Sequence, residues 1–379
     1  MSKNRSIFED VATEKPTTVA PTGGLIDQGR EDWRTGVATW MKILFAMVAL
    51  MVVVGGLTRL TDSGLSITEW NVIKGALTPM NEAAWLIEFE KYKAIPEYQL
   101  QNKGMDLSGF KSIYWWEWGH RQLGRLVGLV WFVGLVFFVA TKTIPRGWQW
   151  RMVLVGLLGG LQGAIGWWMV SSGLTGRMVD VASYRLATHL GLAFIILATL
   201  FWFIMKLNRS EMEMFQARRT RDDASARMAK ILLVLAFAQI LLGALVAGID
   251  AGRGYIDWPM MGGEFLPSES FDYQPMWTNL FENPALVQFN HRMLGYALML
   301  VGVFAWFKSR GAAHRKIRIG FKAVMFMLFI QMVLGIFTVL YAAPWYFAIV
   351  HQVGAIFVML LILQTLFAAT YPSEQSVRG

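Results

Sequence analysis

Residues 117–125 read EWGHRQLGR, and residues 288–296 read QFNHRMLGY. The two stretches share His, Arg, Leu and Gly in the same register, but Glu117 in the first is matched by Gln288 in the second. Similarity within one chain at a fixed spacing indicates repeated structural units. This pair of stretches therefore predicts a fold built from two related halves.

The similarity continues on both sides of these stretches. With an offset of 188 residues, VGGLTRLTDSGLSITEWNVIKGALTP at 54–79 overlays LGALVAGIDAGRGYIDWPMMGGEFLP at 242–267. With a smaller offset, SYRLATH at 183–189 overlays WYFAIVH at 345–351. Since the offset shrinks along the chain, the first half carries the longer loop. Further matched pairs are Gly55 with Gly243, Gln162 with Gln331, and Gly166 with Gly335.

The composition indicates a membrane protein. Of the 379 residues, 55% are hydrophobic and only 16% are charged, which is more apolar than a soluble domain usually is. A run of roughly 20 apolar residues is long enough to cross a bilayer. Eight such runs recur, at 40–59, 121–141, 151–171, 186–206, 230–249, 290–307, 320–341 and 345–368. The sequence therefore predicts an all-α polytopic membrane protein with eight transmembrane helices.

The repeat and the predicted helices together specify an architecture. Four helices fall in each half, so both halves enter the membrane in the same sense and form a parallel repeat with a pseudo-twofold axis along the membrane normal. We expect two four-helix bundles, with sites built from side chains in the bundle cores. The predicted divisions are a cytoplasmic tail at 1–39, an N-terminal bundle at 40–206 with a long outer loop at 60–119, a cytoplasmic linker at 207–229, a C-terminal bundle at 230–370 and a cytoplasmic tail at 371–379.

The formal net charge of +9 is unevenly distributed. Basic residues gather at 141–151, 206–230 and 308–318, whereas the loops at 60–119 and 251–289 are acidic on balance. The positive-inside rule places the basic loops and both termini in the cytoplasm and the two acidic loops outside. Because topology accounts for the positive charge, nucleic acid is not an expected partner. At most, the basic loops would contact anionic membrane lipid.

The chain contains no cysteine. This excludes disulfides, thiolate ligation of haem, iron–sulfur clusters and cysteine-based zinc sites.

Four of the five histidines lie on predicted membrane helices. They are His120, His189, His291 and His351, one each on the second, fourth, sixth and eighth helices near the outer side. Ionisable residues inside a membrane are costly and usually functional. A hydrogen bond between helices is the alternative role for a single histidine, but four at matching repeat positions favour ligands. The fifth, His314, lies in a basic loop and is interpreted as a solvated bystander.

The arrangement of these histidines favours haem over other metals. Zinc and copper sites usually gather three or four protein ligands in one cluster. Here each bundle offers two histidines on different helices, which suits axial ligation of one haem. Small residues near the histidines would let a flat macrocycle approach the backbone, although glycine is also common in membrane helix packing. These are Gly124, Gly128, Gly166, Gly191, Gly295, Gly335 and Gly354.

Arginines near the outer side are candidate partners for the anionic haem propionates. In the first half they are Arg59, Arg121, Arg125, Arg177 and Arg185, and in the second half Arg253 and Arg292. Anchoring at the membrane interface is the alternative role for each of them.

The two halves differ in charge at matched positions. Arg59 faces Ala247, Arg125 faces Tyr296 and Arg185 faces Phe347, while Glu117 faces Gln288. On a continuous helix Glu117 shares a face with His120 three residues later. A carboxylate there can accept a proton or stabilise positive charge; the alternative is that Glu117 only pairs with Arg121 or another arginine. The asymmetry indicates chemistry in the first half and electron storage in the second.

These motifs resemble those of the haem A synthases, in the branch found in proteobacteria and mitochondria. The resemblance rests on GGLTRLTDSGLSITEW at 55–70, on EFEKYKAIPEYQLQNKGMDLSGFKSIYWWEWGHR at 88–121, and on the four helix-borne histidines. It covers nearly the whole chain after residue 40. Some members carry a cysteine pair in an outer loop, and this chain does not. A mechanism that needs those thiols is therefore not expected here.

The resemblance implies a haem-dependent membrane oxidoreductase that converts a ring methyl of haem O to a formyl group through a hydroxymethyl intermediate. In that reading His120 and His189 hold substrate haem O, Glu117 is the catalytic carboxylate, and His291 and His351 hold a permanent haem b. The product haem A would supply terminal oxidases. The implied location is the bacterial inner membrane, and the implied partners are haem O synthase and cytochrome oxidase assembly factors. The electron partner and any homo-oligomer stay open.

The route of the oxidation also stays open. If both histidines ligate the iron of haem O, no coordination position is free for dioxygen. Either one ligand leaves, or the methyl group loses electrons and water captures the resulting cation. Glu117 suits the second route as a base or charge stabiliser.

Two alternative functions follow from the same histidines. A dihaem b-type cytochrome would stack its haems towards opposite leaflets, whereas these four histidines lie near one leaflet. A haem carrier or chaperone for oxidase assembly would need the ligands but no catalytic carboxylate. Replacing Glu117 by glutamine distinguishes a carrier, which keeps its function, from a synthase, which does not.

Overall fold

The computed structural model describes residues 31–176 and 178–373. Within these ranges the regular structure consists of twelve α-helices and five short 3-10 helices, apart from one isolated bridge between Met261 and Glu264. The all-helical prediction is therefore confirmed. Most of the predicted N-terminal tail, most of the C-terminal tail and Arg177 lie outside the described residues.

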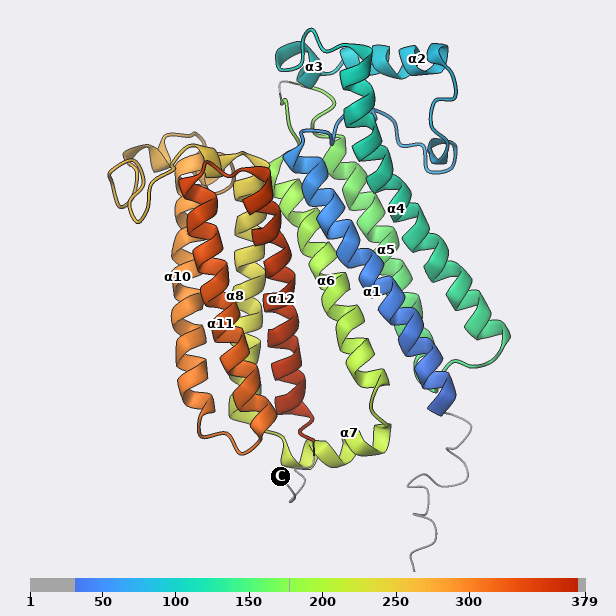
Figure 1. Ribbon diagram of the computed structural model, residues 1–379, viewed down its shortest axis with the longest axis vertical. Coiled ribbons are helices and arrows are strands. Elements are labelled where there is room, and N and C mark those ends of the chain that lie inside the picture. The colour runs from blue at the N-terminus through green and yellow to red at the C-terminus, as the bar shows by residue number, and fades with distance from the viewer. Residues whose placement is uncertain (1–30, 177, 374–379) are drawn as a thin grey trace, which may run out of the picture.

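Eight long helices run side by side and form the body of the molecule (Figure 1). Each coincides with one of the predicted apolar runs, although α4 begins at Leu107, well before the expected start at 121. They are α1 (Glu31–Leu60), α4 (Leu107–Ala140), α5 (Gln149–Val170), α6 (Ser183–Leu207), α8 (Asp223–Gly248), α10 (Pro284–Ser309), α11 (Arg315–Leu340) and α12 (Trp345–Thr370).

Seven of the described helices are long and apolar enough to cross a membrane, so the chain is a multi-pass membrane protein. These seven are α1, α4, α5, α6, α8, α11 and α12. Helix α10 has the same length as α11 and α12, at 26 residues, but it does not reach the same apolar character. Its first half contains Gln288, Asn290, His291 and Arg292, and its last turn contains Lys308.

The long helices contact one another in two cycles. In the first, α1 packs on α4, α4 on α5, α5 on α6, and α6 on α1. In the second, α8 packs on α10, α10 on α11, α11 on α12, and α12 on α8. The two sets meet where α6 contacts α8 and where α12 contacts both α1 and α6.

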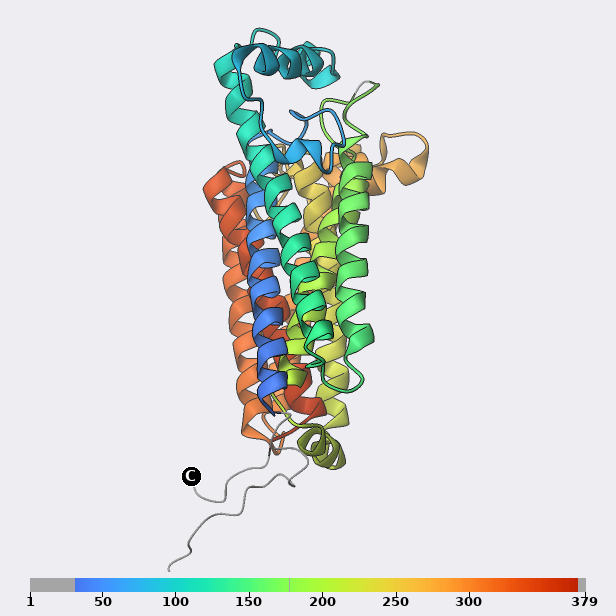
Figure 2. The same cartoon turned by 90° about the vertical axis from the view of Figure 1, so that its right-hand side faces the viewer.

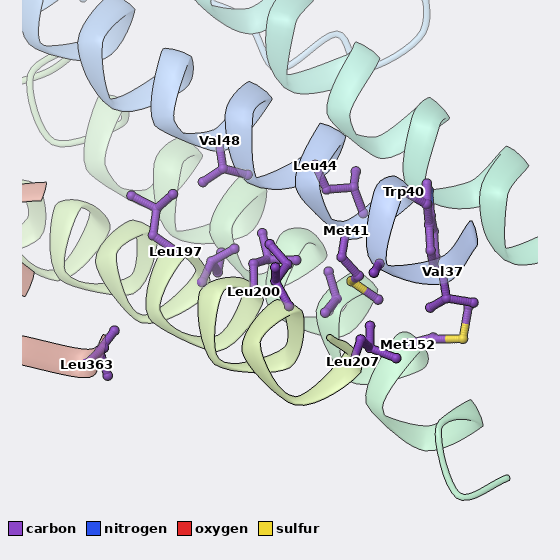
Figure 3. Close-up of a cluster of buried hydrophobic side chains, with 14 of the residues drawn as sticks. Val37, Trp40, Met41, Leu44, Val48, Met152, Leu197, Leu200, Leu207 and Leu363 are labelled. Atoms are coloured by element: carbon purple, nitrogen blue, oxygen red, sulfur yellow. The ribbon is translucent and has the colours of Figure 1, made fainter. Parts of the chain in front are cut away.

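The largest apolar cluster holds the first set together and reaches the second. Figure 3 shows Met41 and Leu44 of α1 facing Leu197 and Leu200 of α6, with Leu363 of α12 beside them. Inside a membrane such contacts stabilise mainly through close packing rather than through exclusion of water. The Trp40 indole of α1 also donates a hydrogen bond to the Val130 carbonyl of α4 (3.0 Å).

The connecting segments at one end of the helices carry additional structure. Helices α2 (Glu82–Lys93) and α3 (Pro96–Leu100) lie beyond the N-terminal end of α4 (Figure 2). The Asp106 carboxylate caps α4 by accepting a hydrogen bond from the Gly109 amide (2.8 Å), which explains why α4 starts there. An aromatic cluster then joins α2 to the early part of α4, through Trp85, Phe89, Tyr92, Phe110 and Tyr114.

The opposite end carries α7 (Glu211–Ala217), together with the start of α1 and the end of α12 (Figure 1). Ser210 and Glu213 form a capping box at the start of α7. The connections after α4 and α10, which are basic in sequence, also lie at this end.

Candidate functional site

Each predicted ligand histidine lies against a glycine of a neighbouring helix. A Cβ atom built on that glycine would come within 2.9–3.2 Å of the imidazole, closer than side chains normally approach, so glycine is what makes room for the ring. The contacts are Gly55 with His120, Gly166 with His189, Gly243 with His291 and Gly335 with His351. These four contacts form two matched pairs under the sequence repeat. Sequence analysis singled out Gly166 and Gly335 near the ligands, but had noted Gly55 and Gly243 only as repeat matches.

In the second half the two histidines face one another. The ring centroids of His291 and His351 are 6.4 Å apart, and the ring planes are nearly perpendicular, at 83°. A metal ion bonded to one nitrogen of each ring at about 2 Å would fit within this separation. The Nδ1 atom of His351 is buried and has no hydrogen-bond partner among the described residues. Gln239 fixes the other histidine, since its amide donates to the His291 carbonyl (2.9 Å).

In the first half the histidines come from α4 and α6. His120 lies against Gly55 of α1, and His189 lies against Gly166 of α5. The Nδ1 atom of His120 is buried and, in the described part of the chain, lacks a hydrogen-bond partner. The Gln162 amide donates to the His189 carbonyl (3.0 Å) and lies 3.2 Å from Nδ1 of the same residue. Gln162 and Gln239 thus make the same kind of contact, but with histidines that are not matched by the repeat, which pairs Gln162 with Gln331.

The donor sets fit haem better than a free metal ion. No group of three or more His, Cys, Asp or Glu residues that could hold a metal ion occurs within the described ranges. Two imidazoles on facing helices would suit one haem, whose macrocycle would supply the other ligands to the iron. His120 and His351 each have a buried ring nitrogen without a hydrogen-bond partner among the described residues. This also fits a role for the two histidines as haem ligands.

Glu117 is buried, at 3% exposure. Its hydrogen bonds run to Arg121 on the same helix and to residues 66–67 of an outer segment of the chain. One carboxylate oxygen accepts two hydrogen bonds from the Arg121 guanidinium (2.6 and 3.0 Å). The other accepts from the Ser66 hydroxyl (2.7 Å) and from the Ile67 amide (2.8 Å). The pairing of Glu117 with Arg121, the alternative considered above, is therefore present. The structure adds Ser66 and Ile67, which sequence reasoning missed.

Gln288 occupies the matching position with fewer contacts. Its amide donates to the Tyr255 carbonyl (3.1 Å), and its Oε1 atom is buried and has no partner among the described residues. The two matched positions therefore differ in chemistry. The Glu117 carboxylate accepts four hydrogen bonds, whereas the Gln288 amide donates one.

Arg121 and Arg292 form the same clasp in the two halves. Arg121 donates to the carbonyls of Ile67 (2.7 Å) and Glu69 (2.8 Å). Arg292 donates to the carbonyls of the residues 188 positions further along, Tyr255 (3.0 Å) and Asp257 (3.0 Å), and also to that of Met260 (3.0 Å). Each arginine thus fastens an outer segment, residues 66–72 or 255–260, to its helix. We call these segments strap 1 and strap 2.

The other predicted arginines within the described ranges also have protein partners. Arg125 donates to the carbonyls of Val72 (2.8 Å) and Asn71 (3.0 Å) in strap 1. Arg185 donates to the Trp168 carbonyl (2.6 Å), and Arg253 lies 3.7 Å from the Asp250 carboxylate. A cavity of about 370 Å³ opens between strap 1, α2 and α4, and Arg121 and Arg125 line it. Propionate binding by any of these arginines stays a prediction.

Arg59 links the two halves. Its guanidinium lies 2.8 Å from the Asp62 carboxylate, 3.1 Å from that of Asp250 and 3.6 Å from that of Asp180. Asp62 and Asp250 are matched repeat positions, and both have left-handed backbones, with φ of 47° and 50°. The pKa of Asp180 is raised by burial and by its two acidic neighbours, against the opposing effect of Arg59. The equivalent turns of the two halves, at Asp62 and Asp250, therefore both form an ion pair with the Arg59 guanidinium.

Fold and site together define a helical membrane protein with two matched histidine pairs, each suited to one haem. Residues 38–363 match the family described as cytochrome oxidase assembly protein, and the chain belongs to this family. It is 58% identical to a protein named "Heme A synthase" from Dinoroseobacter shibae, over 100% of this chain and 99% of that protein. Proteins of the same name from Ruegeria pomeroyi and Paracoccus denitrificans are 54% and 53% identical, over 100% and 99% of this chain and 100% and 98% of theirs. The resemblance read from the motifs is confirmed.

Proposed function

We propose that this protein is a haem A synthase, a membrane oxidoreductase that converts haem O to haem A for terminal oxidases. The observation that carries the proposal is the repeated contact of histidine with glycine in both halves of a chain that matches proteins of that name over its full length. The contrast between Glu117 and Gln288 fits two haem sites with different roles, one reactive and one that stores electrons.

The proposal includes eight membrane spans, with α10 as the eighth. We infer that α1, α4, α5 and α6 form one four-helix bundle and that α8, α10, α11 and α12 form the other, related by a pseudo-twofold axis along the membrane normal. The same cyclic order of contacts in both sets supports this. The matched clasps of Arg121 and Arg292 support it independently. The domain divisions at 40–206 and 230–370 follow from the same inference.

We assign substrate haem O to His120 and His189, and a resident haem b to His291 and His351. The 6.4 Å separation of the second pair and the unpartnered Nδ1 atoms of His120 and His351 fit these groups. When bound, haem b would supply one-electron redox chemistry. Position 288 in that half is a glutamine, which cannot ionise and so neither accepts nor releases a proton.

Glu117 is the proposed catalytic carboxylate of the first half. Arg121, Ser66 and the Ile67 amide fix both of its oxygens at the outer end of α4, three residues before His120. A fixed carboxylate there can stabilise positive charge that develops on the substrate or accept a proton from it. Gln288 cannot ionise, which fits a site that stores electrons.

The proposed location is the bacterial inner membrane, with both termini in the cytoplasm. The start of α1 and the end of α12 lie at the same end of the molecule as the basic connections, which supports this orientation (Figure 1). The proposed partners are haem O synthase and cytochrome oxidase assembly factors, because the family is described by oxidase assembly.

The test is the haem content of cells that make haem O but lack haem A. Expression of this chain should produce haem A, while Glu117→Gln should accumulate haem O or the hydroxylated intermediate, with conversion lowered about 100-fold or more. Glu90→Gln, which changes an exposed carboxylate on α2, is the matched control and should behave as the unmodified chain. An unchanged haem profile on expression would reject the enzyme, and full conversion by Glu117→Gln would contradict the catalytic role of Glu117.

A further inference from the structure

Gln352 of α12 makes a polar contact between the two sets of helices that the proposed reaction does not yet use. Its side-chain amide donates a hydrogen bond to the Val52 carbonyl of α1 (2.8 Å). Gly56 of α1 makes room for this side chain, since a Cβ atom built there would lie 2.6 Å from the amide nitrogen and oxygen of Gln352. The contact between α12 and α1 belongs to the boundary between the two sets. The hydrogen bond therefore joins the proposed haem b half to the proposed substrate half.

This contact lies next to one histidine of each proposed haem site. On α12, Gln352 directly follows His351, a proposed ligand of haem b. On α1, Gly56 directly follows Gly55, which lies against His120, a proposed ligand of haem O. Because an α-helix moves as a rigid element, a shift of α1 at Gly55 would also move the carbonyl to which Gln352 donates.

The repeat supplies a matched pair of positions without this hydrogen bond. Under the same offsets, Gln352 is matched by Leu190 of α6, and Gly56 is matched by Ala244 of α8. Leu190 and Ala244 belong to one apolar cluster where α6 contacts α8. Packing of the two halves at such a boundary therefore does not require an amide, and position 352 differs from its match in chemistry rather than in place.

We propose that Gln352 couples the two haem sites by transmitting the state of the His120 site to the His351 ligand. The inference rests on the proposed function, in which each half holds a haem. Occupation of the first site fixes His120 against Gly55 and so sets the position of α1. Through its hydrogen bond Gln352 then holds α12, and His351 with it, in the position that binds haem b most firmly. Because Gln352 acts through these helices, it is a positioning residue.

The coupling has a consequence for the order in which the sites are used. Coupling between two binding sites is reciprocal, so a filled second site strengthens binding in the first by the same factor. Such factors are typically about 5–150-fold. Substrate haem O is then held firmly only in a protein that already contains its haem b.

The experiment measures how fast purified full-length protein, made in cells that supply haem O, releases haem b to excess apomyoglobin. Four proteins form a double-mutant cycle: the unmodified chain, His120→Ala, Gln352→Met and the double variant. His120→Ala empties the first site. We expect it to speed haem b release at least about fivefold when Gln352 is present, and by less than about twofold in the Gln352→Met background. The electron paramagnetic resonance spectrum of ferric haem b should likewise respond to His120→Ala only when Gln352 is present.

Two further variants separate the hydrogen bond from packing. Methionine has a length similar to that of glutamine and places no amide in the membrane, so Gln352→Met should fold. Gly56→Ala tests the same contact independently, because the added methyl group would displace the Gln352 amide, and it should also abolish the response. Leu190→Met, at the matched position on α6, is the control and should keep the full response of haem b to His120→Ala.

Two results would overturn the coupling. One is an equal response of haem b to His120→Ala with and without Gln352. The other is loss of the response in Leu190→Met as well, which would indicate altered packing between the halves. Failure of the proposed function is a separate outcome, because then the unmodified chain would leave haem O unconverted while the release of haem b is still measurable.

Discussion

At the scale of single residues, Glu117 and Gln288 show how one matched position serves two purposes. Both side chains reach towards an outer strap, but the carboxylate collects four donors where the amide makes one contact. Hydrogen bonds to a charged acceptor are roughly twice as strong as neutral ones. Glu117→Gln would turn an amide group towards donors, so it changes strap 1 as well as the reaction. Haem extraction from the purified variant separates these effects, because a defect in chemistry leaves haem O bound but unconverted, whereas a defect in strap 1 that weakens binding leaves the protein without haem O.

Glu97, a buried acid on α3, makes stability depend on pH. Burial raises its folded-state pKa above the usual value, so its contribution to stability is fully present below about pH 4.5 and is lost as pH rises through about 8. We therefore expect Glu97→Gln to melt a few degrees above the unmodified chain at pH 9, with the difference vanishing at pH 4.5. Thermal unfolding followed across this range measures it. A constant difference at all pH values would contradict a proton bound to Glu97.

At the scale of helices and segments, the glycines opposite the histidines determine how closely the helices approach. Gly243 of α8 faces His291 of α10, and Gly55 of α1 faces His120 of α4. A methyl group at either position would press on an imidazole, and displaced ligands bind metal less well.

We expect Gly243→Ala to lower haem b content about tenfold or more and Gly55→Ala to lower haem O binding while haem b is kept. Absorbance spectra and haem extraction from the purified variants measure both. Gly159→Ala on α5 is the control, since a Cβ atom there meets nothing within 4 Å. Equal loss of haem b in the Gly55 and Gly243 variants would argue against separate sites.

The straps depend on one arginine each. Arg292 donates to three carbonyls of strap 2, and removing it would leave those carbonyls without their partner, at a cost of about 1–3 kcal/mol for a buried group. We expect Arg292→Ala to make residues 255–260 several-fold more sensitive to limited proteolysis. Arg253→Ala, which removes a half-exposed guanidinium nearby, should leave cleavage unchanged. If both variants are cleaved alike, strap 2 is not held by Arg292.

At the scale of the whole molecule, the two sets of four helices meet at the outer end on Arg59 and along the contacts of α6 and α12. The pairing of Asp62 and Asp250 with one arginine explains why position 59 is charged while its match, Ala247, is not: one cation serves both turns. The charge asymmetry at that position therefore has a structural explanation. It ties the proposed substrate half to the proposed cofactor half.

Much of this fold could be predicted from sequence because membrane helices appear in a sequence as continuous apolar runs. The early start of α4 could not, since residues 107–120 are mixed in character and are helical through the Asp106 cap and the packing of Phe110 on α2. The histidines were found because they repeat. The arginine clasps, the Arg59 bridge and the Gln352 contact were missed because each depends on which distant backbone or carboxylate lies opposite, and no local pattern encodes that.

The most direct test of two unlike haem sites is the haem composition of purified ligand variants. The unmodified protein should contain haem b together with haem O or haem A. His120→Ala should keep haem b and lose the O- and A-type haems, whereas His351→Ala should lose haem b. Loss of haem b in His120→Ala with O-type haem retained, or equal loss of all haems in both variants, would contradict the assignment.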